Sequence, residues 1–222
     1  YGGWAADKDA EIWGASGLAW RKAAYTENQP LRWSQNWADQ LASPHRPVTN
    51  VSWWEARAYA RWLNADPEWQ RAQGAVKALA GLRVYLPIEV QWERAARLDN
   101  LGGAHRHRWP WGDEANDLDQ RANVRESRVF RVSAVGCFAP NSFGIWDLSG
   151  NAWEWVDRAT KDSAHAHRRL TDEPYLGGPG FPVMRGGASN YSAEYARASI
   201  SSMLPDDRSS DVGFRVVLSQ AE

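Results

Sequence analysis

The chain contains very little cysteine, and this scarcity excludes several classes of protein. Its 222 residues include one cysteine, Cys137, which rules out an internal disulfide framework and a cysteine-rich metal site. A lone cysteine commonly packs as a small hydrophobe, so we expect Cys137 to be buried. Long apolar runs are lacking too. None reaches the roughly 20 residues of a membrane-spanning helix, and we expect no membrane insertion in this segment.

The chain also lacks an excess of charge of either sign. It carries 26 Lys and Arg residues against 27 Asp and Glu residues, and its net charge is −1. Electrostatics therefore favours neither nucleic acid nor an anionic membrane surface as a partner. Lysine itself is rare, and arginine supplies most of the positive charge, which can reflect a GC-rich genome or a hot habitat, although arginine in place of lysine is an unreliable sign of a thermophile. The composition does not fix the compartment, although we favour the cytoplasm.

Tryptophan, by contrast, is abundant, with 15 residues in the chain. Exposed indole rings could form platforms that stack on sugars, and this is one interpretation of the excess. Tryptophan is nevertheless highly buried on average in folded proteins. We therefore expect most of these rings to lie in the core or to be half-buried.

The sequence pattern indicates one α+β domain over residues 1–222, without internal repeats or linkers. Ser52 and Glu55 form a capping box that begins a helix over residues 53–64, and Pro87 precedes a second helix over residues 88–97. Residues before position 47 have no clear periodicity and are expected to be irregular. We expect two main helices, long loops and short antiparallel strands at residues 82–86, 153–155, 183–185 and 214–218.

The most informative part of the sequence is residues 185–216, where structural residues enclose an aperiodic stretch. Arg185-Gly186-Gly187 stands at one end and Gly213-Phe214-Arg215-Val216 at the other, with Pro205-Asp206 and Arg208 between them. The enclosed residues are rich in Tyr, Ser, Asn and Asp and have neither helical nor strand periodicity. That composition is typical of adaptable binding loops on a rigid scaffold. A solvated surface loop without a binding role would have a similar composition.

Several motifs, in one order, make the chain resemble a known family. They are Pro47-Val48-Thr49-Asn50-Val51-Ser52-Trp53, Trp109-Pro110-Trp111-Gly112, Gly150-Asn151-Ala152-Trp153-Glu154-Trp155, and the Arg-Gly-Gly and Gly-Phe-Arg ends described above. Over residues 47–218 the chain resembles the formylglycine-generating-enzyme (sulfatase-modifying factor) family. The resemblance implies an elaborated C-type-lectin-like fold. It also implies a first strand upstream of Tyr1, so we expect the chain to be part of a longer, bacterial protein.

The resemblance suggests an enzyme, but the residues do not support that interpretation. Oxidising members of the family bind copper and attack their substrate through two cysteines after Arg-Gly-Gly, and this segment contains none. Another branch makes sulfur–histidine conjugates with an added iron-binding domain, whereas the pairs His105/His107 and His165/His167 resemble solvated loop histidines. We therefore predict a protein that is not an enzyme. The alternative is a formylglycine-generating-type oxidase or the remnant of one.

The layout of the enclosed stretch is similar to that of the variable proteins of diversity-generating retroelements. In those systems adenine-directed reverse transcription rewrites chosen codons at surface positions of a lectin-like fold. The resemblance implies a ligand-binding display module for a protein or another macromolecule, and a carbohydrate-binding lectin is a further alternative. Most residue types at the candidate positions can arise from an AAY codon by adenine changes, except Glu194 and Met203. The thirteen candidate contact positions are Asn190, Tyr191, Ser192, Glu194, Tyr195, Ile200, Ser202, Met203, Leu204, Asp207, Ser209, Ser210 and Asp211.

The resemblance also implies a structural calcium site. Asp147, Glu154 and the main-chain carbonyls of Gly150 and Ala152 match its ligands, and carboxylate and carbonyl oxygens suit a hard cation. Such an ion would tie loops down, and no cofactor is required for binding. The alternative is that Asp147 and Glu154 only accept backbone hydrogen bonds or pair with arginines.

Overall fold

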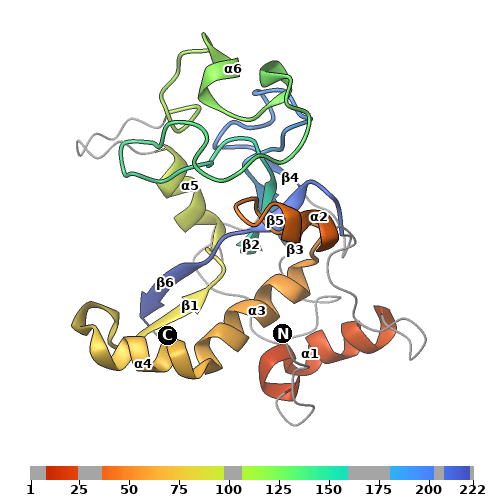
Figure 1. The fold of residues 1–222 in the computed structure, drawn as a ribbon, viewed down its shortest axis with the longest axis vertical. Coiled ribbons are helices and arrows are strands. Elements are labelled where there is room, and N and C mark those ends of the chain that lie inside the picture. The colour runs from red at the N-terminus through yellow and green to blue at the C-terminus, as the bar shows by residue number, and fades with distance from the viewer. Residues whose placement is uncertain (1–8, 25–36, 98–106, 160–180, 203–207, 221–222) are drawn as a thin grey trace.

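The computed structural model describes residues 9–24, 37–97, 107–159, 181–202 and 208–220 of the chain. Within these ranges the fold combines six α-helices with one sheet of four strands and one of two. Figure 1 shows α1, α3 and α4 in the lower part of the molecule and the loops around α6 at the top, with the larger sheet between them. The predicted α+β class is confirmed. No helix in the described ranges has the length and apolar character that crossing a membrane requires.

The helices are more numerous than the sequence indicated. The two expected helices are present as α3 (Trp53–Ala65) and α5 (Glu89–Arg97). The expectation of only two main helices was wrong, because α1 (Asp9–Ala24) lies in the region predicted to be irregular, and α4 (Pro67–Ala75) follows α3. Gly14, at φ 68°, breaks α1 into two helical pieces, which explains its weak periodicity. The shorter helical segments are α2 (Trp37–Ala42), η2 (Lys77–Leu79), α6 (Leu118–Arg121) and η3 (Arg125–Ser127).

Polar side chains fix the points where α3 and α4 begin. The Ser52 hydroxyl accepts the N–H of Glu55, and the Glu55 carboxylate accepts the N–H of Ser52 at 2.8 Å, which is the expected capping box. At α4 the Asp66 carboxylate accepts two N–H groups of the first turn, and Pro67 occupies a position where its missing N–H costs nothing. Both helices thus satisfy donors that would otherwise lack partners.

The larger sheet has the strand order β4-β3-β2-β5. Strand β2 (Trp153–Ala159) pairs antiparallel with β3 (Phe181–Arg185), which pairs antiparallel with β4 (Ser201–Ser202). Strand β5 (Val212–Phe214) pairs with β2 in parallel, whereas the other strand pairs are antiparallel, as the sequence predicted. The strand predicted over residues 214–218 is divided between sheets, because β6 (Val217–Gln220) pairs with β1 (Leu82–Tyr85).

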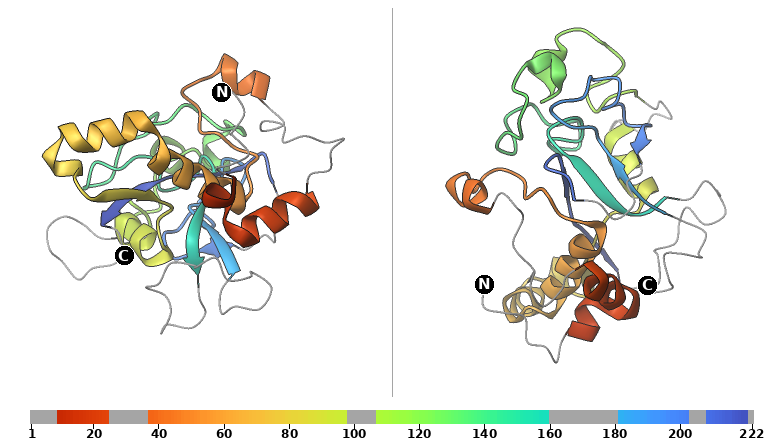
Figure 2. Two further views of the ribbon diagram at one scale, coloured as in Figure 1. Left: turned by 90° about the horizontal axis from the view of Figure 1, so that it is seen from below. Right: turned by 90° about the vertical axis from the view of Figure 1, so that its right-hand side faces the viewer.

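Strand β2 separates two hydrophobic clusters, because its side chains alternate between the two faces of the sheet. Trp153 and Trp155 belong to a cluster with α1 and α3. Val156 belongs to a second cluster, in which Trp92 of α5 packs with Leu148 and Val183. Helices α3 and α5 therefore pack against opposite faces of the sheet, and α1 lies beside α3 in both views of Figure 2.

Most tryptophan rings are core or half-buried, as predicted, in the part of the chain that the structure describes. The largest side chains with almost no exposure include Trp53, Trp92, Trp109 and Trp155. Trp146, at 48% exposure, is the one described ring in the exposed class. The described residues therefore do not form an extended sugar-stacking face of tryptophans.

Candidate functional site

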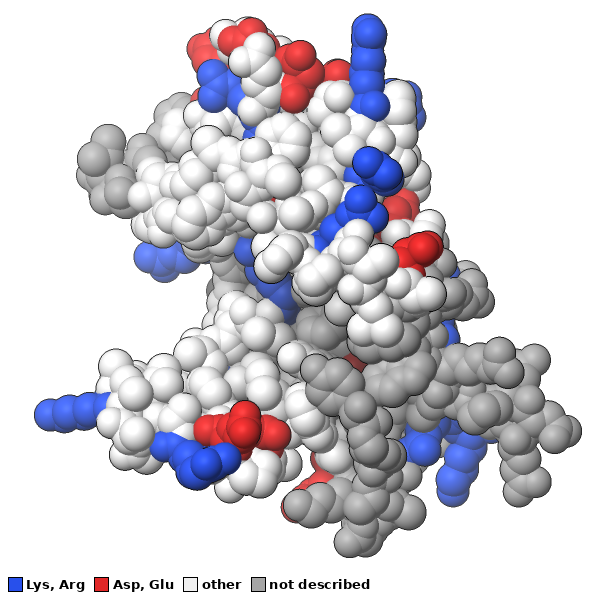
Figure 3. All heavy atoms as spheres, in the orientation of Figure 1, with Lys and Arg blue, Asp and Glu red and all other residues white. Residues whose placement is uncertain are grey.

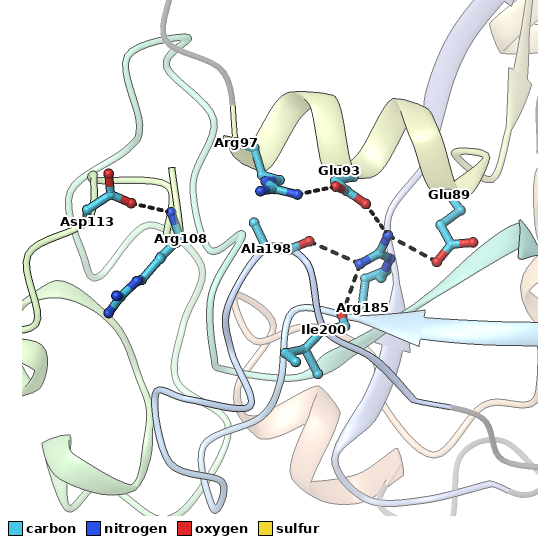
Figure 4. A network of polar contacts seen from close by, with 8 residues as sticks. All are labelled: Glu89, Glu93, Arg97, Arg108, Asp113, Arg185, Ala198 and Ile200. Carbon is cyan, nitrogen blue, oxygen red and sulfur yellow. Dashed lines mark hydrogen bonds and ion pairs between the residues drawn. The ribbon is translucent and has the colours of Figure 1, made fainter. Parts of the chain in front are cut away.

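Arg185 fixes the first end of the candidate segment, which we define as residues 189–211. Its guanidinium lies 2.6 Å from Glu93 and 3.0 Å from Glu89, both on α5. The same group donates to the main-chain oxygens of Ala198 at 3.0 Å and Ile200 at 3.1 Å. Figure 4 shows how this one side chain, which is 3% exposed, joins the helix to the middle of the segment. Arg185 therefore has the structural role that its place beside the two glycines suggested.

The pKa values of Glu89 and Glu93 on α5 are shifted in opposite directions. Burial alone would raise the pKa of Glu93, but the guanidinium groups of Arg97 and Arg185 hold that pKa below its usual value. Burial prevails at Glu89, whose pKa is raised even though Arg185 lies nearby, and the charge of Glu93 contributes to the rise. The pair between Arg185 and Glu93 is thus the better-stabilised ion pair of the two.

Arg208 fixes the far end of the candidate segment. Its guanidinium donates to both carboxylate oxygens of Glu55 in the first turn of α3, with a distance of 2.9 Å from Nε to one of them. Main-chain bonds continue the attachment, because the carbonyl of Ser209 accepts the N–H of Asn50 at 2.9 Å. The carbonyl of Asp211 accepts the N–H of Trp153 at 2.8 Å. Both ends of the segment are therefore attached to helices and strands of the core.

Three side chains bind the backbone between these ends, and two of them, Trp109 and Ser149, are buried. The Trp109 indole N–H donates to the carbonyl of Ala193 at 2.8 Å, and the Ser149 hydroxyl donates to the carbonyl of Ala196 at 2.7 Å. The Glu126 carboxylate accepts the N–H of Ala193 at 3.1 and 3.3 Å. Sequence reasoning missed these supporting residues. The Trp-Pro-Trp-Gly motif was visible, but nothing in its spacing indicated which carbonyl its indole would reach.

Glycines at both ends allow close backbone approach, as the sequence indicated. Gly187 has φ 73°, and a Cβ there would lie 2.9 Å from the Cβ of Ala196. A Cβ on Gly213 would lie 2.6 Å from the carbonyl oxygen of Val48, well inside van der Waals contact. The glycines therefore let the segment and its neighbouring strand lie directly against the scaffold.

The candidate positions differ in how far their side chains are exposed. Among the ten that the structure describes, none is buried, whereas the intervening Ala193, Ala196 and Ala198 are 0–1% exposed. The exposed positions are Asn190, Glu194, Tyr195 and Ser210. The half-buried positions are Tyr191, Ser192, Ile200, Ser202, Ser209 and Asp211. The remaining three, Met203, Leu204 and Asp207, lie outside the described residues.

Two tyrosines connect the core to this outer surface. The ring of Tyr191 meets the buried ring of Trp153 edge-on, with centroids 5.6 Å apart. Tyr195 meets Tyr191 in the same manner at 5.7 Å and is itself 54% exposed. An aromatic side chain supported in this way offers a large contact area at a small cost in conformational entropy.

The two acidic residues of the implied calcium site make contacts within the protein. The Glu154 carboxylate accepts two bonds of 2.6 Å from the guanidinium of Arg215 and a third, also 2.6 Å, from the indole N–H of Trp92. Asp147 accepts the N–H of Gly136 at 2.8 Å. Arg215 also donates to the main-chain oxygen of Asp147 at 3.3 Å and of Trp146 at 3.1 Å. Asp147 and Glu154 therefore make the backbone and arginine contacts that the sequence offered as the alternative to calcium, and calcium binding stays a prediction.

The space around Gly150 and Ala152 is confined by the surrounding chain. Gly150 has φ 76°, and a Cβ there would overlap the carbonyl of Asn123, only 2.2 Å away. Ala152 is buried beside Glu154.

Burial raises the pKa of Asp147. Burial by itself would lower the pKa of Arg215, but the negative charges of Glu154 and Asp147 raise that pKa above its usual value. No group of three His, Cys, Asp or Glu side chains able to hold a metal occurs among the described residues.

A pocket of about 550 Å³ opens beside Arg215. Its lining combines apolar side chains with the polar groups just described, including Val135, Trp146, Asp147 and Phe214. Figure 3 shows that this face of the molecule is hollowed between the upper loops and the lower region of α4, β1 and β6, with basic atoms at the floor of the hollow. The pocket lies on the Glu154 side of strand β2, whereas Tyr191 packs against Trp153 on the other side.

The cysteine and histidine predictions have different outcomes. Cys137 is exposed, so the expectation that it is buried was wrong, and it lies outside the candidate segment. The loop that carries Cys137 packs through its neighbours, since the N–H of Gly136 binds Asp147. His107 lies 3.5 Å from Asp113 through Nδ1. His105, His165 and His167 lie outside the described residues.

Comparison with known proteins agrees with the sequence motifs. Residues 7–220 match the family model of the sulfatase-modifying factor enzyme 1-like domain. The chain is 32% identical to the formylglycine-generating enzyme of Streptomyces coelicolor, over 93% of the chain and 63% of that enzyme. It is 31% identical to the Bos taurus enzyme, over 79% of the chain and 44% of the relative. It is also 30% identical to the inactive C-alpha-formylglycine-generating enzyme 2 of Bos taurus, over 76% of the chain and 49% of the relative.

The chain therefore spans between 44% and 63% of the length of these relatives. Among solved structures, Treponema denticola variable protein 1 superposes with a TM-score of 0.56 at 23% identity, over 80% of this chain and 72% of that one. CarF superposes with a TM-score of 0.53 at 26% identity, over 80% and 69%. These likenesses confirm the C-type-lectin-like fold that the sequence motifs implied. The chain belongs to the sulfatase-modifying factor enzyme 1-like family.

Proposed function

We propose that this chain is a ligand-binding display module, the diversified variable protein of a diversity-generating retroelement, and that residues 189–211 form its binding surface. The observation that carries the proposal is the difference between the buried positions of the segment and its candidate contact positions. Its buried positions, Ser189, Ala193, Ala196 and Ala198, are small, and carbonyls of the alanines are bound by scaffold side chains, while no described candidate position is buried. Side chains can therefore change while the backbone keeps its path.

The chemistry of the surface suits a macromolecular partner. Tyr195 supplies exposed aromatic area beside the half-buried Tyr191. The exposed Asn190 and Ser210 can donate and accept hydrogen bonds, and Glu194 contributes a carboxylate that pairs with Arg197 at 2.8 Å. Aromatic anchors among small polar groups are the composition of adaptable protein-binding surfaces. The fold shared with a Treponema denticola protein whose name describes it as variable adds support at the level of architecture.

The enzymatic alternative rests on identities of 30–32% with formylglycine-generating enzymes. Against it, the chain has one cysteine, and the segment after Arg185 contains none. A copper(I) site for thiol oxidation needs soft sulfur ligands, which tyrosine, serine and alanine cannot replace. We expect the purified chain with added copper to leave a cysteine-containing peptide unoxidised. Copper-dependent formation of formylglycine would favour the oxidase instead. A lectin would be indicated by glycan binding that depends on the exposed ring of Trp146.

Sequencing of the locus in sister isolates tests the retroelement proposal directly. We expect substitutions concentrated in the codons of the candidate positions and absent from the buried alanines Ala193, Ala196 and Ala198. We also expect a nearby repeat of the same stretch with adenines at the substituted bases. Identical codons in every isolate, with no such repeat, would show that the segment is not diversified.

A further inference from the structure

Residues 125–131, with the sequence Arg-Glu-Ser-Arg-Val-Phe-Arg, form a loop with an excess of positive charge, which we call the basic loop. Its three arginines are exposed, and within the described ranges Arg128 and Arg131 form no ion pair. The one acidic side chain of the loop, Glu126, accepts the N–H of Ala193. The carboxylates of a partner can therefore pair with guanidinium groups that the protein itself does not neutralise.

The basic loop also presents an apolar group between its arginines. Phe130 is 61% exposed, the largest value for an aromatic ring among the described residues, and Val129 is 39% exposed. Phe130 has φ 53° and Arg128 has φ 58°, whereas the other described non-glycine residues with positive φ are Asn or Asp, which adopt this region more easily. A bulky residue held there is strained, and such strain is concentrated at binding sites. The loop thus keeps an exposed ring in a costly conformation.

The basic loop is bound to main-chain atoms of the candidate segment. The N–H of Arg125 donates to the carbonyl of Tyr191 at 2.8 Å, and its Nε donates to the carbonyl of Asn190 at 3.2 Å. At the other end of the loop, the buried Asn123 side chain donates to the carbonyl of Arg131 at 2.9 Å. Figure 1 shows the green loops around α6 beside the blue loops of the segment. Because these bonds use carbonyls, they persist when side chains at the candidate positions change.

We infer that the basic loop is the constant part of the binding surface, and that this surface binds polypeptides in which acidic side chains lie beside an apolar one. The inference rests on the proposed function, because it assigns the loop and residues 189–211 to one ligand. Phe130 and Tyr195, the two most exposed aromatic rings of the described residues, supply the apolar contacts. Arg128 and Arg131 select for carboxylates.

A polypeptide suits this surface better than a nucleic acid does. Helix α6 packs against η3, which begins the basic loop, and the exposed Glu114, Asp117 and Asp119 lie in and beside α6. These carboxylates repel a long phosphate backbone, and the whole chain carries a net charge of −1. A short acidic stretch can meet the arginines of the loop without crossing the carboxylates around α6.

Selection from a random library of short peptides displayed on phage tests the class of ligand. We expect the peptides selected by the unaltered protein to be enriched several-fold in Asp and Glu, with an aromatic or aliphatic residue nearby. The double variant Arg128→Gln with Arg131→Gln should select peptides without that acidic enrichment, because it lacks the two guanidinium groups. If the unaltered protein selects no peptides, or selects peptides without acidic enrichment, the inference is overturned.

The affinity for one selected peptide, measured by fluorescence anisotropy, separates the inference from the proposed function. Arg128→Gln with Arg131→Gln should weaken binding by roughly tenfold and reduce its dependence on salt. The matched control, Lys77→Gln with Arg83→Gln, removes two exposed charges from the lower region of the molecule and should bind like the unaltered protein. Tyr195→Ala should also weaken binding, because it removes the aromatic contact of the candidate segment.

The pattern of losses decides between the outcomes. Unchanged binding by the double glutamine variant, together with a loss in Tyr195→Ala, would overturn the inference and leave the proposed function standing. The reverse pattern would leave the basic loop as a peptide site but would count against residues 189–211 and against a shared ligand. Tighter binding of a single-stranded DNA oligonucleotide that displaces the peptide would overturn the choice of a polypeptide. The melting temperatures of these variants should be similar, since the substituted side chains are exposed.

Discussion

The indole nitrogen of Trp109 donates a 2.8 Å hydrogen bond to the carbonyl of Ala193, 84 residues further along the chain. Trp109 is fully buried, and its ring stacks on that of Trp111 at 5.7 Å. The bond therefore supports the candidate segment directly below the exposed Glu194 and Tyr195. The Trp-Pro-Trp-Gly motif, which in the sequence served only as a family signature, thus supports the backbone of the candidate segment.

Replacing Trp109 with Phe should destabilise the fold, because the buried carbonyl of Ala193 loses its side-chain donor. We expect the free energy of unfolding, measured by urea denaturation, to fall by about 1–3 kcal/mol. Trp111→Phe is the matched control, since the Trp111 N–H binds the carbonyl of the exposed Glu114, where water can substitute. An equal loss in both variants would indicate that ring packing, rather than the hydrogen bond, gives Trp109 its importance.

Exchanging the exposed candidate positions should leave the fold intact. A variant with Ala at Asn190, Glu194, Tyr195 and Ser210 should change the free energy of unfolding by less than about 2 kcal/mol in total, because exposed side chains contribute little. A single Ala196→Leu substitution should cost about 1–3 kcal/mol or more, since Ala196 is 0% exposed against Gly187. Thermal unfolding of the two variants makes the comparison. Collapse of the fourfold variant would mean that these side chains belong to the core.

Gly213→Ala should be strongly destabilising, although it adds only a methyl group. The new Cβ would lie 2.6 Å from the carbonyl oxygen of Val48, and neither backbone can move without disturbing β5. We expect a loss of about 2–4 kcal/mol in chemical denaturation, comparable with overpacking elsewhere in protein cores. Gly74→Ala is the control, because nothing lies within 4 Å of a Cβ in α4, and it should stabilise by about 0.5–1 kcal/mol. Similar behaviour of the two variants would refute the role of close contact.

The ion pair of Arg185 and Glu93 should make stability sensitive to acid. Because the guanidinium groups hold the pKa of Glu93 below the ordinary 4.5, the folded state binds its proton less readily than the unfolded state. The stabilisation is therefore present above pH 4.5 and is lost as the pH falls through the lower, folded pKa. We expect the stability gap between the unaltered protein and Glu93→Gln to be constant from pH 6 to 8 and to shrink below pH 4.5.

The control for this measurement is Glu68→Gln, which removes an exposed pair with Arg71 and should cost little at any pH. Unfolding by urea across the pH range gives both comparisons. A gap for Glu93→Gln that stays constant down to the lowest pH at which the protein folds would mean that charge does not contribute there.

Local signals in the sequence were enough to predict some of the fold. The capping box of Ser52 and Glu55 and the alternation around Glu154 identified α3 and β2, because both depend on neighbouring residues. Helix α1 was missed because Gly14 interrupts its periodicity, and burial of Cys137 was wrongly expected because exposure depends on the tertiary packing of its loop. The parallel pairing of β2 with β5 is likewise a tertiary relationship.

For the candidate site, too, the sequence predicted local features but not the tertiary contacts. Composition identified the segment, and the motifs indicated that Arg185 and Arg208 have structural roles, which the structure supports. Their partners, Glu93 and Glu55, could not be named in advance, since each lies about 90 to 150 residues away in sequence. The same limit applies to Arg215, which the sequence did not connect to Glu154.

Both ends of the candidate segment meet at one place on the scaffold. In the sheet, Arg185 of β3 lies opposite Glu154 of β2, and Val212 of β5 lies opposite the adjoining Trp153. The stretch between Arg185 and Val212 therefore leaves the sheet and returns to it beside neighbouring residues of β2. The separation of the two ends is therefore set by the sheet and not by what lies between them. Doubling the length of a flexible loop costs only about 0.6 kcal/mol in closure entropy. The scaffold can accordingly carry longer or shorter segments, so that relatives can differ in the reach of this surface as well as in its side chains.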